Sequence, residues 1–310
     1  MSTYLYGPVP SRRLGRSLGI DLVPLKTCTY DCVYCQLGKT TLKTTSRQAW
    51  APLEAVLTEL KAHLSTEPDY ITISGSGEPT LHSGIGVLIE AIKAMTSTPV
   101  AVLTNSSLLW LPEVREALGD ADLVIPSLDA GEEDLFRQVN RPHRDITFRR
   151  MVDGLYEFRR AFPGQCWLEV LLLDGITGLP SPVQQIKEIA ERIAPDRILL
   201  NTVVRPPAHA TAVPVPQSLM ESFALTFGDK AEVIGSIRNL PAGGSSQTGS
   251  QDVLALVARR PCTLEDVMAG LGLTHQEASK SLKELSAAGF LVRERQGKRL
   301  YFKASPSHRQ

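Results

Sequence analysis

Three cysteines, Cys28, Cys32 and Cys35, lie within eight residues of one another in a chain that has only five cysteines in 310 residues. Cysteine thiolates are the soft ligands that iron–sulfur clusters take. Three thiolates from one short loop can hold three irons of a [4Fe–4S] cluster and leave the fourth iron with an open coordination position. As zinc enzymes illustrate, an open position on a metal supports chemistry. The spacing therefore predicts a [4Fe–4S] cluster that binds a further ligand.

Zinc binding and disulfide formation are the alternatives for this loop. A structural zinc site normally needs four ligands, but Cys166 and Cys262 are isolated and the first histidine is His63. A disulfide would use two of the three cysteines and leave one over. Grouped cysteines in a protein without export signals usually bind metal or take part in catalysis, so the cluster is favoured.

The spacing Cys28-x-x-x-Cys32-x-x-Cys35, with Tyr34 before the last cysteine, resembles the signature of the radical S-adenosylmethionine (SAM) superfamily. Residues 7–19 (GPVPSRRLGRSLG) resemble a subgroup of iron–sulfur oxidoreductases that is grouped with the tRNA wyosine-base synthases. The resemblance spans roughly residues 4–240. Wyosine enzymes carry additional N-terminal cysteines for a second cluster, which this chain lacks, and this difference argues against wyosine synthesis itself.

The resemblance implies two cofactors, a [4Fe–4S] cluster and SAM, and an external electron donor of the flavodoxin or ferredoxin type. In this superfamily the amino and carboxylate groups of SAM chelate the open iron. One electron then breaks the S–C5′ bond, which gives methionine and a 5′-deoxyadenosyl radical that abstracts hydrogen from a substrate. The substrate here, whether an RNA base, a peptide or a small molecule, is not identified by the sequence.

Short apolar segments that are typical of buried strands alternate with helical periodicity along the first 240 residues. The predicted strands are 19–23, 69–74, 100–104, 123–127, 167–173 and 197–204. The predicted helices between them are 53–64, 85–92, 111–118, 148–155 and 183–193. Such alternation predicts a parallel sheet in an α/β fold, and the resemblance implies the same TIM-like partial (β/α)6 barrel. Its site is expected where the strands end.

Polar residues follow several of these strands. Glycines in the segment 74–79 (SGSGEP) allow a ligand to approach the backbone, and Glu78 offers a carboxylate to an ammonium group. This segment resembles the Gly-Glu-Pro motif that contacts the SAM amino group in the superfamily. The predicted cofactor-binding residues are Tyr34, Gly77, Glu78, Asn105, Ser127, Asp129, Asn201 and Val203.

The resemblance implies that Ser127 and Asp129 lie near the ribose and methionyl carboxylate of SAM, and that Tyr34 and residues 201–207 contact the adenine. A helix-capping role is the alternative for Asp129, and a core position is the alternative for Tyr34.

No catalytic residue is predicted beyond the cluster, because no pair of side chains suggests a nucleophile and its base. Glu169 and Arg205 belong to strand ends and are candidates for substrate contact. Arg12 and Arg13 form a basic cluster with Arg16 that could bind a phosphate or carboxylate. A solvent-exposed basic turn is the alternative interpretation of that cluster.

The C-terminal region differs from the rest of the chain. Residues 241–251 are rich in Gly and Ser and predict a flexible linker between a barrel domain (1–240) and a small domain (252–305). Helices starting at Thr263 and Thr274, each with an acid three residues later, precede two strands at 290–295 and 299–303, which predicts a winged helix-turn-helix. Ten basic and six acidic residues after 251 suit contact with nucleic acid, while contact with a peptide or protein is the alternative.

Composition places the chain among ordinary globular proteins, with 43% hydrophobic residues and a net charge of zero. No run approaches the ~18 apolar residues of a membrane span, and the N-terminus lacks a signal-peptide pattern, so we expect a cytoplasmic protein without membrane contact. The sequence therefore predicts a radical SAM enzyme. The alternative is an iron–sulfur redox-sensing regulator that binds DNA through the winged helix.

Overall fold

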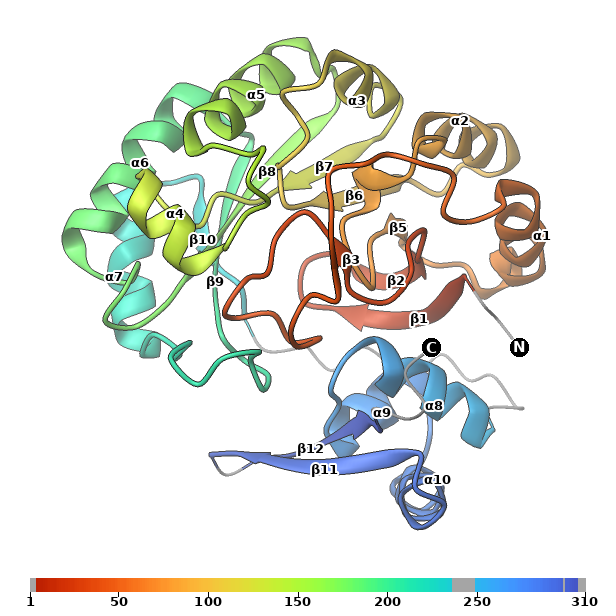
Figure 1. Cartoon of the computed structure of the whole chain (residues 1–310). Coiled ribbons are helices and arrows are strands. Elements are labelled where there is room, and N and C mark those ends of the chain that lie inside the picture. The colour runs from red at the N-terminus through yellow and green to blue at the C-terminus, as the bar shows by residue number, and fades with distance from the viewer. Residues whose placement is uncertain (1–3, 236–248, 298, 306–310) are drawn as a thin grey trace.

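Parallel strands and the helices that connect them form the larger part of the molecule (Figure 1). The structure, a computed structural model, describes residues 4–235, 249–297 and 299–305. Its main sheet consists, in spatial order, of β1 (Leu5–Ser11), β2 (Gly15–Ile20), β5 (Tyr70–Ile73), β6 (Val100–Thr104), β7 (Leu123–Pro126), β8 (Gln165–Leu172), β9 (Arg197–Thr202) and β10 (Ala231–Val233). All neighbouring pairs are parallel except β1 and β2.

The predicted α/β partial barrel is confirmed, and each of the six predicted strands corresponds to a strand of the sheet. Two strands were not predicted: β10 adds a further parallel strand, and the antiparallel β1 precedes the first predicted one. Pro8 and Pro10 lie within β1 and cannot donate backbone hydrogen bonds, which is typical of an edge strand. Outside this sheet, β3 (Thr27–Cys28) and β4 (Leu42–Lys43) form a short parallel pair beside the cysteine loop.

Helices cover the outer face of the sheet (Figure 1). These outer helices are α1 (Leu53–His63), α2 (Ile85–Met95), α3 (Pro112–Ala117), α5 (Phe148–Ala161), α6 (Pro180–Ile193) and α7 (Gln217–Phe227). Helix α4 (Glu133–Val139) instead lies beside the cysteine loop, where the Val33 amide donates to the Val139 carbonyl at 2.9 Å. The 3-10 turns are η1 (Leu64–Thr66) and η2 (Pro79–Leu81). The five predicted helices are present. The sequence analysis missed α4, which is only seven residues long, and α7, which follows a proline-rich segment.

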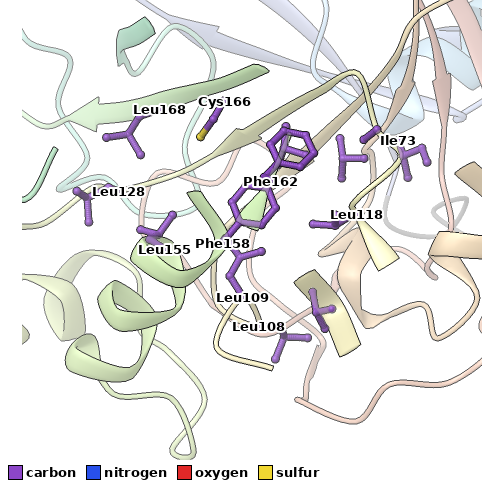
Figure 2. Close-up of a cluster of buried hydrophobic side chains, with 14 of the residues drawn as sticks. Ile73, Leu108, Leu109, Leu118, Leu128, Leu155, Phe158, Phe162, Cys166 and Leu168 are labelled. Atoms are coloured by element: carbon purple, nitrogen blue, oxygen red, sulfur yellow. The ribbon is translucent and has the colours of Figure 1, made fainter. Parts of the chain in front are cut away.

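The core between α5 and the sheet shows the role of Cys166 (Figure 2). Phe158 and Phe162 stack with ring centroids 4.8 Å apart, and they lie in the same cluster as Leu168 of β8. Cys166 belongs to this apolar cluster and is fully buried. It is therefore a core residue.

The C-terminal residues form the predicted winged helix. Its elements are α8 (Ser250–Arg259), α9 (Leu264–Leu271), α10 (His275–Ala287), β11 (Leu291–Gln296) and β12 (Arg299–Ala304). Thr263 and Thr274 cap α9 and α10 in reciprocal capping boxes with Asp266 and Glu277, as predicted. Most of the predicted 241–251 linker lies outside the described residues, and α8 begins at Ser250, before the predicted end of that linker.

The winged helix packs against the edge of the barrel. Helices α8 and α9 contact β1 (Figure 1), and Val9 of β1 belongs to the same buried cluster as Val253 and Leu256 of α8. The Tyr301 hydroxyl donates a hydrogen bond to the Val204 carbonyl, just after β9, at 2.7 Å. The C-terminal domain therefore covers the edge strand β1 and reaches from there to the end of β9. No helix in the described part of the chain is long and apolar enough to cross a membrane.

Candidate metal centre

The loop that follows β2 brings the three cysteines to one side of the barrel. Backbone turns fold this loop tightly, with the Cys35 amide 3.1 Å from the Cys32 carbonyl and the Gly38 amide 3.1 Å from the Cys35 carbonyl. Cys28, Cys32 and Cys35 line one cavity of about 400 Å³ together with residues from the ends of β5 to β9. The structure therefore places the predicted cluster ligands where the strand ends converge.

Each of the three cysteine sulfurs has one side-chain nitrogen at hydrogen-bonding distance. The contacts are Lys26 Nζ to Cys35 Sγ at 3.0 Å, Asn105 Nδ2 to Cys28 Sγ at 3.5 Å and Asn140 Nδ2 to Cys32 Sγ at 3.5 Å. Donors of this kind stabilise negative charge on sulfur, and hydrogen bonds to sulfur tune iron–sulfur clusters. The three nitrogen donors therefore suit thiolates that are bound to a metal.

Cys28 and Cys32 do not have the properties of nucleophiles. Burial, with the charge of Glu78, raises the pKa of Cys28 to about 12, and burial together with Cys28 and Asp129 raises the pKa of Cys32 well above its ordinary value. A reactive cysteine needs a lowered pKa, whereas a coordinated metal deprotonates a thiol. Among the described residues, no group of three His, Cys, Asp or Glu could hold a single metal ion. In a [4Fe–4S] cluster each thiolate binds a different iron, so three separate thiols with sulfur-directed donors fit that group.

The loop after β5 carries the predicted Gly-Glu-Pro motif and is held tightly against the cysteine loop. The Glu78 amide donates to the Thr27 carbonyl at 3.1 Å. A Cβ atom on Gly77 would lie 1.8 Å from that same carbonyl oxygen, so only glycine fits this position. Both Gly77 and Glu78 line the cavity.

The Glu78 side chain connects the ends of two strands. One carboxylate oxygen accepts hydrogen bonds from the Thr80 amide (3.1 Å), the Thr80 hydroxyl (2.6 Å) and the Thr104 hydroxyl (2.7 Å). The other accepts from the Asn105 amide at 2.8 Å. Burial raises the pKa of Glu78, although these hydrogen bonds oppose the shift. Glu78 therefore fixes the loop geometry, and its predicted contact with an amino group stays a prediction.

A second buried carboxylate, Asp129, supports Tyr34. The Tyr34 hydroxyl donates to Asp129, which also accepts from Asn140 Nδ2 at 2.8 Å and from the Leu171 amide at 3.1 Å. Burial raises the pKa of Asp129 to about 6, although the hydrogen bonds from Tyr34 and Asn140 lower it. Tyr34 lines the cavity, while Asp129 is not among the lining residues. Direct contact of Asp129 with a cofactor stays a prediction.

The remaining predicted site residues come together at the same cavity. The lining includes Asn105, Ser127, Asn201, Val203, Arg12, Arg13, Glu169 and Arg205. Four of these form one network: Arg12 Nη1 donates to Asn201 Oδ1 at 3.1 Å, Asn201 Nδ2 donates to Glu169 Oε1 at 2.8 Å, and Arg13 forms an ion pair with Glu169. The ends of β8 and β9 are thus joined to the turn between β1 and β2.

Sequence reasoning missed Lys26 and Asn140 as neighbours of the cysteines. Lys26 lies two residues before Cys28, and this closeness in sequence was the available signal. It also missed three residues of the C-terminal domain, Leu256, Arg259 and Arg260, which line the cavity. Their distance along the chain gave no signal that they would lie near the cysteines.

Arg259 connects the C-terminal domain to the loop after β5. Its guanidinium lies over the Tyr6 ring, 5.2 Å from the centroid, and its Nε is 3.7 Å from Asp21 Oδ2. Asp21 in turn accepts hydrogen bonds from the Ser76 hydroxyl and, at 3.0 Å, from the Ser76 amide. Burial raises the pKa of Asp21, and Arg259 and the Ser76 hydrogen bonds oppose this shift. The winged helix is therefore connected, through Asp21, to Ser76 in the loop that lines the candidate site.

Two family models match the chain. The model described as the radical SAM superfamily matches residues 22–194, and the model described as the MarR family matches residues 252–299. The first match contains the cysteine loop and the strand ends up to β8, and the second contains most of the winged helix.

Curated relatives match most of the chain. It is 30% identical to a UPF0026 protein of Methanocaldococcus jannaschii over 97% of this chain and 96% of the relative. It is 37% identical to a UPF0026 protein of Synechocystis sp. over 65% of this chain and 76% of the relative. It is also 39% identical, over 92% of this chain, to a protein named GTPase Obg from Brachyspira hyodysenteriae, but it spans only 43% of that protein. The predicted grouping with wyosine-base synthases is not confirmed by these comparisons.

Solved structures are similar in fold. A radical SAM methyltransferase from Sphaerobacter thermophilus has a TM-score of 0.50 at 15% identity, over 70% of this chain and 66% of that chain. HydG, a maturase of the [FeFe]-hydrogenase, has a TM-score of 0.51 at 11% identity, over 82% of this chain and 55% of that chain.

Proposed function

Because the chain belongs to the radical SAM superfamily, we propose that it is an enzyme that holds a [4Fe–4S] cluster through Cys28, Cys32 and Cys35 and abstracts hydrogen from its substrate. The superfamily uses a [4Fe–4S] cluster and SAM. Cys28, Cys32 and Cys35 would hold the cluster, which would supply the electron for cleavage of SAM to methionine and a 5′-deoxyadenosyl radical, the species that would remove the hydrogen atom. The chemistry belongs to the cofactors, and the protein positions them.

The observation that carries this proposal is the arrangement around the cysteines. Three thiols share one cavity, each beside a nitrogen donor, and the cavity is lined by the residues predicted to bind SAM other than Asp129. Gly77 and Glu78 hold the loop after β5 against the cysteine loop, and Tyr34 is fixed by Asp129. Val203 and Asn201 close the β9 side of the same cavity. These residues would orient SAM and limit the access of water.

The test is anaerobic reconstitution of the full-length protein with iron and sulfide, followed by iron analysis, visible absorbance and chromatography. With SAM and a chemical reductant, we expect 5′-deoxyadenosine to form. Cys32→Ala should lose the cluster absorbance and the 5′-deoxyadenosine. Cys166→Ala is the matched control, because Cys166 lies in the apolar core, and it should keep both. Colourless wild-type protein, or protein that holds zinc in place of iron, would refute the assignment.

An external protein of the flavodoxin or ferredoxin type is proposed as the natural electron donor. It should replace the chemical reductant in the same assay. A reducing cytoplasm is the proposed location, since oxidising compartments convert free thiols to disulfides. The proposed domain division is a barrel (1–240) and a winged helix (252–305), joined by the segment 241–251.

A redox-sensing regulator is the second candidate, and the MarR-family match of residues 252–299 is the observation that favours it. Helix α10, the counterpart of a recognition helix, contributes Ser279, Leu282 and Lys283 to a cavity that it shares with the barrel. The strand-end residues around the cysteines support the enzyme, because a redox sensor has no need of them. A gel shift at low salt that responds to the oxidation state of the cluster, without 5′-deoxyadenosine formation, would favour the regulator.

A further inference from the structure

Four arginines meet where the barrel and the winged helix join. Arg12 and Arg13 lie in the turn between β1 and β2, Arg205 follows β9, and Arg260 follows α8. All four line the cavity that also contains the three cysteines. Three segments that are far apart in the sequence therefore bring positive charge to one side of the candidate site. We call these residues the arginine cluster.

The arginine cluster has fewer anionic partners than cations. Arg13 is paired with Glu169, and Arg205 Nη2 lies 3.8 Å from Asp266 Oδ1. The hydrogen-bond acceptor that Arg12 uses is the neutral amide oxygen of Asn201, at 3.1 Å. In Arg260, both Nε and Nη2 are buried without a hydrogen-bond partner among the residues that the structure describes. Among the residues that the structure describes, two carboxylates thus pair with the four guanidinium groups.

An excess of positive charge is energetically unfavourable where the side chains are partly buried. Burial and the neighbouring guanidinium groups of Arg13, Arg205 and Arg260 lower the pKa of Arg12 to about 10, and Glu169 opposes this only in part. Buried charges are normally paired, and a buried donor without a partner is unfavourable. A ligand with two negative charges and several acceptor oxygens would satisfy both requirements. Phosphate is the group whose geometry guanidinium matches best.

We propose that the arginine cluster binds a phosphate group of the substrate, so that the adjoining part of the substrate extends toward the three cysteines. The role as substrate rests on the proposed function, whereas phosphate binding itself does not. Because Arg260 comes from the winged helix, the site is complete only when this domain is packed against the barrel.

The positive lining continues beyond the arginine cluster. A second cavity, of about 1100 Å³, shares Arg12 and Arg205 with the first and lies between the ends of β9 and β10 and the winged helix. Lys283 of α10, Arg293 of β11 and Arg299 of β12 line it, against the acids Glu265 and Asp266. This arrangement favours a ligand with more than one phosphate, such as a nucleic-acid strand, over a single nucleotide.

The test measures binding to full-length, cluster-loaded protein with saturating SAM. The probe is a fluorescently labelled single-stranded oligonucleotide, with adenosine 5′-monophosphate, inorganic phosphate and an acidic peptide as competitors. We expect Arg260→Gln to weaken oligonucleotide binding at least tenfold and to reduce the slope of log affinity against log salt by about one. Arg144→Gln removes the same charge from a side chain that is 90% exposed on the barrel, and it should bind like the wild type.

Arg260→Lys separates a binding role from a folding role, since it keeps the charge and should recover part of the affinity. Tighter binding of the oligonucleotide than of the mononucleotide supports a strand, and equal binding supports a free nucleotide as the source of the phosphate. Wild-type affinity in Arg260→Gln would overturn the proposal. So would equal binding of the acidic peptide, or displacement of phosphate by SAM in a titration that begins without SAM. If phosphate binds but no 5′-deoxyadenosine forms, only the proposed function fails.

Discussion

Asp129 is a buried carboxyl group that follows β7 in the barrel. It is 4% exposed and accepts hydrogen bonds from Tyr34, Asn140 and the Leu171 amide. Burial is the larger influence, so the pKa of Asp129 rises to about 6 in spite of these donors. An acid of this kind is more easily protonated in the folded chain than in the unfolded chain, and the stability of the protein must depend on pH.

The sign of this dependence follows from proton binding. An unfolded aspartate has a pKa near 3.9, so between about pH 4 and pH 6 the folded state binds more protons and the free energy of unfolding falls as pH rises. A shift of roughly two pKa units corresponds to a loss on the order of 3 kcal/mol. Asp129→Asn should remove this part of the slope in urea unfolding of the cluster-free protein at pH 4, 5 and 6.

Asp120→Asn is the control for that experiment, because Asp120 is exposed, and it should retain the wild-type slope. If Asp129→Asn also showed the wild-type slope, the raised pKa of Asp129 would be refuted.

Residue types at local spacing made the grouping of the three cysteines predictable. The three cysteines belong to one short, tightly folded loop, so residues that are close in the sequence are also close in space. The donors beside them were harder to predict, because Asn140 is brought to Cys32 by the packing of α4 and the turn after it. Nothing in the sequence around Asn140 reports that packing.

The loop between β5 and α2 depends on one close backbone contact. The Cβ atom of an alanine at position 77 would lie 1.8 Å from the Thr27 carbonyl oxygen, and this backbone atom cannot move aside alone. Gly77→Ala should therefore displace the loop from the cysteine loop and lower the free energy of unfolding by about 1–3 kcal/mol. Urea unfolding measures the loss. We also expect less iron per chain after reconstitution.

Gly235→Ala is the matched control, because no atom of the described residues lies within 4 Å of its added Cβ, and it should resemble the wild type. Gly77→Ala with wild-type stability would mean that the loop adapts without cost, contrary to the tight contact.

Most elements of the barrel were predictable because buried parallel strands are continuous apolar runs and amphipathic helices repeat every three to four residues. Val100–Thr104 was predicted to the residue. Strand β1 was not, since Pro8 and Pro10 interrupt it and its partner is only antiparallel β2. Strand β10 is three residues long, which is too short for a pattern to show.

At the level of the whole molecule, the barrel and the winged helix form an interface with a common apolar cluster and an ion pair. Val9 completes the hydrophobic core of the winged helix, and Arg259 contacts Asp21 and Tyr6 of the barrel. Sequence patterns predicted the barrel and the winged helix but not the interface between them. That interface depends on how the surfaces of the two folded domains fit together. The residues that form it carry no periodic signal.

Docking of the winged helix can be tested at Val9, which is 5% exposed within the winged-helix core cluster. Val9→Asp would place a carboxylate beside Val253 and Leu256, where a charge is unfavourable. We expect this variant to exchange backbone amide hydrogens faster in α8 and α9 and to scatter X-rays as a more extended particle. Iron binding should persist, because the three cysteines and the nitrogen donors beside them all belong to the barrel.

The control is the same substitution at an exposed site on the barrel. Val87 in α2 is 62% exposed, and Val87→Asp should leave exchange in α8 and α9 unchanged. Tyr301→Phe, which removes only the hydrogen bond to Val204, should loosen the contact by about 1 kcal/mol and give an intermediate result. If Val9→Asp exchanged like the wild type, the winged helix would not depend on β1 for its position. The arginine cluster would then need another explanation for how Arg260 stays beside Arg12 and Arg205.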